Sequence, residues 1–207
     1  MMKKSILFAA LLCLPLFLAA HKDDKNPKYL LGAVPEVNGI VTFQKDFSVT
    51  DKNEQQIYDI MLAYIKNTLI ENAIQKQEPY YTRIISEEKE NGIIVARIEE
   101  YMTFKRIPII SLDRTRFRYL LSASVKGQKV SLTITQISYY YNEDMDGKNG
   151  VHYKAEEWIT DKEAVNKKGT KLYPRSGKFR RLTIDRVEDI FNSFMDTFST
   201  KQGVVED

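Results

Sequence analysis

A two-residue alternation of apolar and polar positions runs through much of the chain. Around Phe117 it places Tyr119 and Leu121 on one face, with Arg116 and Arg118 on the other. Alternation with this period is typical of strands that bury one face and leave the other in water. It predicts strands over residues 41–49, 80–86, 93–104, 114–125 and 129–141, and a short strand over residues 151–159.

Turn residues separate these segments, and one segment changes phase. Asn91-Gly92 and Gly127 favour tight turns, because Asn and Gly tolerate a positive φ. Near Gln136 the apolar positions move from one parity to the other. One extra residue in a strand returns the apolar side chains after it to the same face of the sheet, so we expect a β-bulge near Gln136.

Three other segments are predicted to be helices. Residues 53–72 have an amphipathic stripe that begins after Asp51 or Asn53, either of which can cap the first turn. Thr160 and Glu163 have the spacing of a capping box, which predicts a short helix over residues 160–167. The last helix, over residues 183–198 with Thr183 as its cap, has a strong apolar stripe formed by Ile184, Val187, Ile190, Phe191, Phe194, Met195 and Phe198.

The resulting order, β-α-β-β-β-β-α, predicts an α+β fold. Long strands curl, so a single antiparallel sheet can pack both amphipathic helices on one face and leave the other face open to water. We expect one such domain over residues 29–199. A polar tail at residues 21–28 precedes it, and a C-terminal tail at residues 200–207 follows it.

The first residues have the organisation of a secretory signal peptide. Lys3 and Lys4 precede an apolar core that ends at the small residues Ala19 and Ala20. The apolar run is shorter than the roughly 20 residues that a membrane-spanning helix needs. We therefore expect residues 1–20 to be cleaved off, leaving a periplasmic or secreted chain without a transmembrane helix. Lipoprotein processing at Cys13 is disfavoured, because the large Leu12 stands where a small residue is required.

Cleavage would leave a near-neutral chain with few reactive side chains. The formal charge is +3, from 31 basic and 28 acidic residues, and the leader contains the single cysteine. Two histidines cannot build a multi-histidine metal site, and a hydrolytic triad would have to use His152. The acidic loop at residues 142–150 begins like a calcium-binding loop, but Tyr153 stands where such a loop has its last glutamate. We expect no catalytic residue, no metal and no cofactor.

Basic and aromatic residues remain as candidates for a binding site. The stretch 167–186 is rich in Lys and Arg, and Lys178, Arg180 and Arg181 are its candidates for contact with an anionic ligand. The alternative is a solvated loop balanced by nearby carboxylates. Trp158 could stack on a sugar or anchor the short helix. Arg116 and Arg118 are candidates on the open face of the sheet.

Several segments resemble a known family: YLLGAVPEVNG (29–39), VTFQKDFSV (41–49), QIYDIMLAYI (56–65), SLDRTRFRY (111–119), AEEWITDKEAVNKKGTKL (155–172) and SGKFRRLTID (176–185). They are similar to an uncharacterised family of exported bacterial proteins, domain of unknown function 4468, which has a TATA-binding-protein-like (TBP-like) fold. The resemblance implies that fold and export, but no functional residue. No nucleic-acid partner is expected, because the mature charge is near zero and the open face lacks the phenylalanine wedges that kink DNA.

Three functions fit these observations. The first is an exported, non-catalytic binding or envelope-associated domain, whose partner is an anionic glycan, a lipid headgroup or an envelope protein. The second is a carrier of small apolar ligands, with a cavity between the sheet and the last helix that Phe191, Phe194 and Phe198 would line. The third is a hydrolase that uses His152 with nearby carboxylates.

N-terminal sequencing of the protein from its native host tests the leader. We expect the mature chain to begin at or near His21, because Ala19 and Ala20 suit the peptidase. A lipid-modified N terminus at Cys13 would contradict this prediction.

Overall fold

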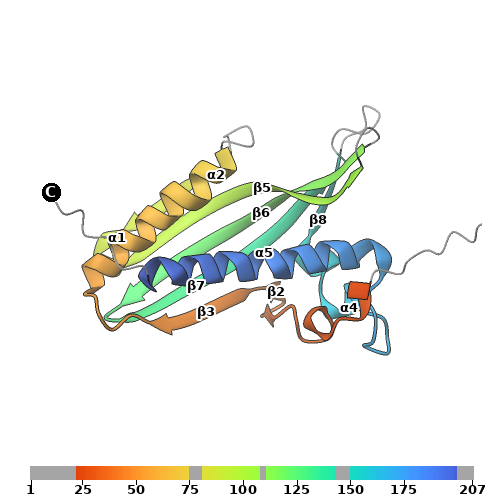
Figure 1. Ribbon diagram of the computed structural model, residues 1–207, viewed down its shortest axis with the longest axis horizontal. Helices are drawn as coiled ribbons and strands as arrows, with labels where there is room; N and C mark the ends of the chain where they lie inside the picture. The colour runs from red at the N-terminus through yellow and green to blue at the C-terminus, as the bar shows by residue number, and fades with distance from the viewer. Residues whose placement is uncertain (1–21, 75–80, 108–110, 143–149, 200–207) are drawn as a thin grey trace, which may run out of the picture.

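The computed structural model describes residues 22–74, 81–107, 111–142 and 150–199 (Figure 1). The predicted leader, the predicted C-terminal tail and residues 143–149 of the acidic loop lie outside these ranges. Among the described residues, no helix is both long and apolar enough to cross a bilayer.

The described elements follow the predicted order, with several short additions. The first half contains η1 (Lys22–Lys25), η2 (Pro27–Tyr29), β1 (Glu36–Val37), β2 (Ile40–Val41), β3 (Phe43–Ser48), α1 (Glu54–Tyr64), the π-helical turn η3 (Ile65–Ile70) and α2 (Glu71–Ile74). The second half contains β4 (Arg83–Glu88), η4 (Lys89–Asn91), β5 (Ile93–Ile107), β6 (Ser111–Lys126), β7 (Lys129–Tyr141), β8 (Val151–Lys154), α3 (Ala155–Trp158), α4 (Asp161–Ala164) and α5 (Pro174–Ser199).

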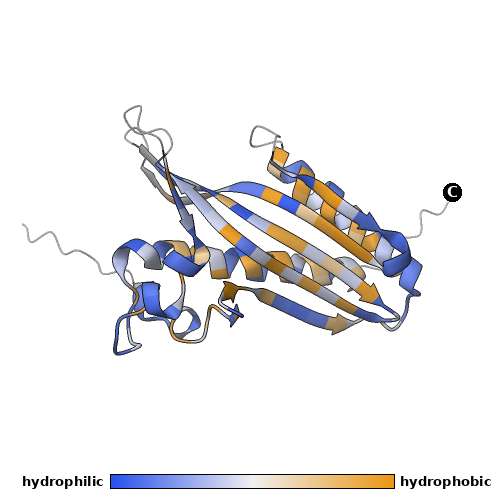
Figure 2. Cartoon of the chain, turned by 180° about the vertical axis from the view of Figure 1, so that it is seen from behind, coloured by the Kyte–Doolittle hydropathy of each residue, from blue (hydrophilic) through white to orange (hydrophobic). Residues whose placement is uncertain are grey.

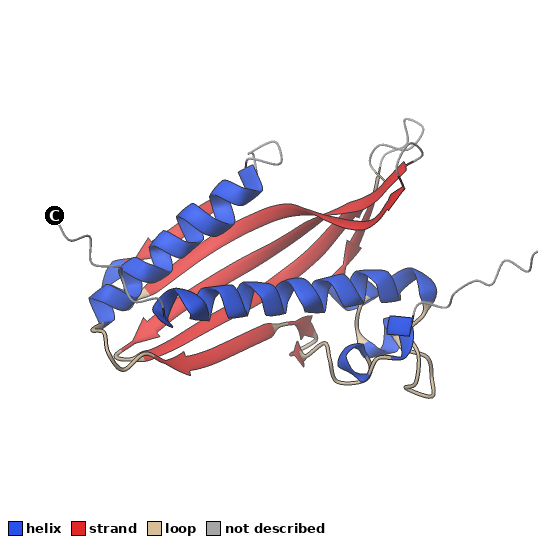
Figure 3. Ribbon diagram, in the orientation of Figure 1, coloured by secondary structure: helices blue, strands red, loops and turns tan. Residues whose placement is uncertain are grey.

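One antiparallel sheet forms the frame of the molecule. Its strands lie in the order β3-β7-β6-β5-β4, and β8 also pairs with β7. Strand β3 pairs with the first half of β7, whereas β8 pairs with its last four residues. The α1–η3–α2 segment and α5 both cover the same face of this sheet (Figure 3). The predicted α+β class, with helices on one face of one main antiparallel sheet, is confirmed; β1 and β2 form a separate two-stranded sheet.

Local signals in the sequence explain how these elements begin and bend. Asn53 caps α1 in a full capping box, because its side chain accepts from Gln56 N and the Gln56 side chain accepts from Asn53 N. The predicted bulge in β7 is present: Gln136 has a φ of 52°, and the pairing with β6 shifts register between Arg118 and Leu120. Side chains on both halves of β7 therefore point to the core.

Two features near the second half differ from the prediction. The strand predicted over 151–159 ends at Lys154, and the chain turns into α3, which buries Ala155. Thr160 precedes α4, but its side chain makes no capping hydrogen bond to the helix. Its hydroxyl instead donates to the carbonyl oxygen of Glu156, 3.4 Å away.

The segment predicted as a polar tail packs against the domain. Asp24 is buried, its backbone oxygen accepts from Leu172 N at 2.9 Å, and its carboxylate pairs with Arg181. Lys28 forms ion pairs with Asp185 and Glu188. A charged segment looks solvated in the sequence when its ion-pair partners lie far away in the chain. Here the partners are Arg181, Asp185 and Glu188 of α5, more than a hundred residues away.

The apolar core lies between the sheet and the two long helical segments. The ring of Phe194 contacts the rings of Phe47, Tyr64 and Phe198, with centroids 5.2–5.9 Å apart. These rings occupy the space where a carrier cavity was predicted, so the apolar-carrier hypothesis has no support from this part of the core.

Truncation of Phe194 tests whether α5 is part of the core. Phe194→Ala should lower the free energy of unfolding by about 3–5 kcal/mol, because it removes a fully buried ring. Asn192→Ala, on the exposed side of the same helix, should change it by less than about 0.5 kcal/mol. Urea denaturation followed by circular dichroism measures both. A loss below about 1 kcal/mol for Phe194→Ala would contradict the packing described here.

Candidate functional site

The last helix begins nine residues before the predicted start, so the later part of the basic stretch is helical. Helix α5 starts at Pro174, and Gly177 N donates to Tyr173 O at 2.8 Å. Proline suits the first turn of a helix, which needs no N–H there. Gly177 allows a close approach, since an added Cβ would lie 2.8 Å from Leu172 Cβ. Part of the stretch for which a solvated loop was the alternative therefore forms the first turn of α5.

Arg180 is a buried structural residue, contrary to the prediction that it binds a ligand. Its side chain is fully buried and donates to the carbonyl oxygens of Tyr29, Leu30 and Ile159, and to the carboxylate of Asp161. Three of these distances are 2.6 Å. Burial lowers the pKa of Arg180, and the Asp161 carboxylate opposes that shift. Arg180 thus joins α5 to the N-terminal segment and to the α3–α4 region.

Lys178 and Arg181 also point to partners within the domain. The Lys178 ammonium lies 2.8 Å from an Asp113 carboxylate oxygen and 4.3 Å from the centre of the Phe104 ring. Arg181 pairs with Asp24. Lys178 and Arg181 are therefore both paired within the domain, whereas the hypothesis of an anionic ligand required their charges to be free. The basic residues that remain exposed in this stretch include Lys167, Lys168 and Arg175.

Trp158 is an anchor, which was the alternative to sugar stacking. Its indole lies parallel to the Tyr153 ring, with centroids 4.1 Å apart, and edge-on to Phe179 at 5.9 Å. The residue is half-buried against the core. One face of the indole is therefore already used by the protein.

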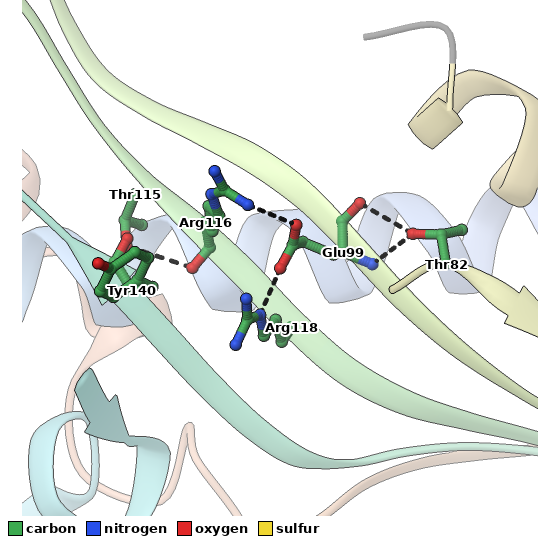
Figure 4. A network of polar contacts seen from close by, with 6 residues as sticks. All are labelled: Thr82, Glu99, Thr115, Arg116, Arg118 and Tyr140. Carbon is green, nitrogen blue, oxygen red and sulfur yellow. Dashed lines mark hydrogen bonds and ion pairs between the residues drawn. The ribbon is translucent and has the colours of Figure 1, made fainter. Parts of the chain in front are cut away.

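The two remaining candidates, Arg116 and Arg118, meet on the open face of the sheet. Seen from behind, this face carries no helix (Figure 2). Both guanidinium groups contact Glu99 of β5: Arg116 Nη1 lies 3.2 Å from one carboxylate oxygen, and Arg118 Nε donates to the other. The Glu99 side chain is only 3% exposed, whereas those of Arg116 and Arg118 are 29% and 22% exposed. The buried carboxylate thus lies between two partly exposed guanidinium groups (Figure 4).

Thr82 holds Glu99 from the other side. Its hydroxyl accepts from Glu99 N at 2.9 Å and donates to Glu99 O at 3.2 Å (Figure 4). The Thr82 side chain thereby satisfies the backbone N–H and carbonyl groups of Glu99, next to the point where the regular pairing of β5 with β4 begins. The position of Glu99 is therefore fixed by both its backbone and its side chain.

Tyrosine rings extend this cluster to two further arginines. The guanidinium carbon of Arg118 lies 4.3 Å from the Tyr81 ring centre, and that of Arg97 lies 5.0 Å from it. Arg114 lies in the same way over Tyr101, at 4.0 Å. A cation held over an aromatic ring keeps its charge in a defined place at little cost in solvation.

The cluster has a clear excess of positive charge, and we call it the arginine cluster: Arg97, Arg114, Arg116 and Arg118. Among the described side chains of β5 and β6 that face this side, Glu99 is the one carboxylate. In the described part of the chain, the two terminal nitrogens of Arg118 have no hydrogen-bond partner and Arg97 has no carboxylate partner. Planar guanidinium groups of this kind bind carboxylate, sulfate or phosphate oxygens in pairs.

Sequence reasoning found two of these arginines and missed Arg97, Arg114 and both tyrosines. Arg114 could have been found by extending the alternation of β6 by one step from Arg116. Arg97 could not, because its place beside Arg118 depends on the pairing of β5 with β6 and on Tyr81, which precedes β4. Glu99 and Glu100 point to opposite faces, as adjacent residues of a strand do. Glu100 pairs with Arg186 of α5, with both N···O distances below 3 Å.

The structure gives no support to a hydrolytic site at His152. The imidazole is exposed and stacks on the Tyr140 ring, with centroids 4.4 Å apart. Within the described residues it forms no hydrogen bond to a carboxylate or a hydroxyl group, and no cluster of metal-ligating side chains is found there. A general base needs such an orienting partner.

The architecture and this open face define a TBP-like α+β domain. The chain belongs to the family DUF4468, described as a domain of unknown function with TBP-like fold, whose model matches residues 43–140. Membership is shown by the crystal structure of a DUF4468 family protein from Bacteroides ovatus. That protein is 34% identical, with a TM-score of 0.73, and the match covers 85% of this chain and 96% of the other.

A second solved structure shows the same fold. A TBP-like protein from Parabacteroides distasonis is 18% identical, with a TM-score of 0.65, over 82% of this chain and 99% of the other. No curated protein matches the chain. The comparisons therefore define family and fold, and leave the function to be argued from the site.

Replacement of Arg180 tests its structural role. Arg180→Ala should lower the free energy of unfolding by about 3–5 kcal/mol, because it leaves Asp161 and three carbonyl oxygens without their buried partner. Arg175→Ala, on the exposed first turn of the same helix, is the control and should be near neutral. Equal urea midpoints for the two variants would show that Arg180 does not join these segments.

Proposed function

We propose that this protein is an exported, non-catalytic binding domain that holds an anionic ligand on the open face of its sheet. The observation that carries the proposal is the set of contacts that the guanidinium groups of Arg97 and Arg118 make. Both are held in place by Tyr81, and Arg118 also by Glu99, yet neither uses its full set of donors within the described chain.

Pre-organisation makes this arrangement suited to binding. A free arginine side chain loses about 2 kcal/mol of rotamer entropy when it is immobilised. Glu99 and the tyrosine rings have already restricted these side chains before any ligand arrives. A ligand that brings carboxylate, sulfate or phosphate oxygens then meets donors in a fixed position, which is the general route to affinity on an open surface.

Export is the second part of the proposal and rests on the first twenty residues. Lys3 and Lys4, the apolar core and Ala19-Ala20 have the order of a signal peptide. The anionic compounds in reach of an exported bacterial domain include glycans and lipid headgroups of the envelope. The apolar-carrier and hydrolase hypotheses have no comparable observation in their favour.

Retention on immobilised heparin, a general polyanion, tests the binding face. The wild-type protein should bind at low salt and elute as salt rises, because exposed charges are screened over about 8 Å at physiological ionic strength. The double variant Arg97→Gln/Arg118→Gln should lose most of this retention. Circular dichroism and urea denaturation establish that it is folded, and Arg118→Lys, which retains the positive charge without the planar fork, should have intermediate retention.

The matched control removes the same charge elsewhere. Lys167→Gln/Lys168→Gln alters two exposed lysines of the basic stretch and should leave retention nearly unchanged. Loss of binding in this control, with full binding in Arg97→Gln/Arg118→Gln, would place the site in the basic stretch and overturn the proposal. Retention that ignores salt in every variant would also overturn it.

A further inference from the structure

The open face has a hollow, lined by both polar and apolar residues, at the end of β6 away from the arginine cluster. It has a volume of about 510 Å³, and its polar lining is Asp46, Ser48, Ser124, Lys126, Lys129 and Ser131. These side chains come from β3, β6 and β7, where Ser131 lies between Asp46 and Ser124 in the sheet. The middle of β6, at Arg118, and its end, at Lys126, therefore both carry groups that can bind a polar ligand.

Charge at this hollow is also positive. Lys126 and Lys129 are exposed, and within the described chain neither forms an ion pair. Asp46 accepts hydrogen bonds from Ser131 and Gln44, which lower its pKa, so it is ionised at neutral pH. The hollow thus contains two lysines and one carboxylate, and that carboxylate already accepts hydrogen bonds from Ser131 and Gln44.

The path between the two ends passes Leu120 of β6 and several hydroxyl groups. Ser122 of β6 pairs with Thr133 of β7, and Thr135 lies one position further towards the arginine cluster on the same face. All three are partly exposed. From Arg118 to Lys126 the strand advances eight residues, roughly 26 Å at the usual rise per residue. A ligand that used both ends would have to be an extended chain.

We infer that the ligand is a linear acidic polysaccharide that lies along β6, with its carboxylates at the arginine cluster and at Lys126 and Lys129. This inference rests on the proposed function of the arginine cluster. Ser122 and Thr133 match the hydroxyl-rich middle of such a chain, because each hydroxyl can both donate and accept, whereas the Thr135 hydroxyl already donates to Val41 O at 3.3 Å. A lipid headgroup is too short to reach both ends.

The tyrosines argue against a single-stranded nucleic acid. Such ligands gain affinity by stacking bases on exposed aromatic faces. Here Arg114 covers a face of Tyr101 and Arg118 covers a face of Tyr81, at 4.0 and 4.3 Å. Tyr140 is stacked on His152. The rings hold the cations in place and leave the ligand to be recognised by its charges and hydroxyl groups.

Chain-length dependence of affinity tests the inference. Oligogalacturonates of increasing defined length, from the dimer upward, are titrated against the full mature protein by calorimetry. Short fragments should bind weakly at the arginine cluster, and affinity should rise about tenfold or more once one chain reaches both ends. In Lys126→Gln/Lys129→Gln the short fragments should bind as before, and the gain with length should disappear.

Three matched ligands complete the experiment. Methyl-esterified oligogalacturonate retains the sugar without the charge and should not bind, whereas polyglutamate retains the charge without the sugar and should bind more weakly than an oligogalacturonate of equal length. Equal binding of polyglutamate, tighter binding of single-stranded DNA, or the absence of a gain with length would overturn the inference while leaving the proposed anion site standing. Failure of every acidic ligand, short or long, would instead refute the proposed function itself.

Discussion

The pairing of β5 with β6 is the constraint on which the rest of this structure depends. Adjacent side chains on a strand point to opposite faces, so Glu99 and Glu100 are separated by the sheet itself. Glu100 is covered by α5 and pairs there with Arg186; burial acts to lower the pKa of Arg186, but the hydrogen bonds to Glu100 raise it overall. Glu99 turns to the open face, where the register places Arg116 and Arg118 beside it. One register therefore both anchors the last helix and builds the candidate site.

Two kinds of arginine follow from this arrangement, and burial distinguishes them. Arg180 is surrounded by protein, so its charge must be balanced by four acceptors, and it serves to join distant segments of the chain. Arg118 lies at a surface where water can satisfy its remaining donors, so it can exchange water for a ligand. The density of positive charge along the sequence is higher around Arg180, yet Lys178, Arg180 and Arg181 all form ion pairs within the domain. Local charge in a sequence says little about which cations a ligand can reach.

The open face combines rigid cations with hydroxyl groups. Tyr81 and Tyr101 contribute by holding guanidinium groups, which limits their own use as stacking surfaces. A broad, shallow face of this kind favours ligands that make many weak contacts along their length over small molecules that need enclosure. The packed rings around Phe194 agree with this, since they fill the space between the sheet and the C-terminal end of α5.

Much of the fold could be predicted from local patterns, because alternation, caps and bulges depend on neighbours in the chain. The capping box at Asn53, the bulge at Gln136 and the opposite facing of the two glutamates are of this kind. The start of α5 could not be predicted in this way, since the close approach of Leu172 that calls for a glycine at position 177 is seen only in the folded structure. The same holds for the site. The sequence by itself determined which residues of β6 face the solvent, through the period of a strand. Only the tertiary structure decided that Arg180 is buried and that Arg97 joins the cluster, because burial and cross-strand neighbours are set by segments far apart in the chain.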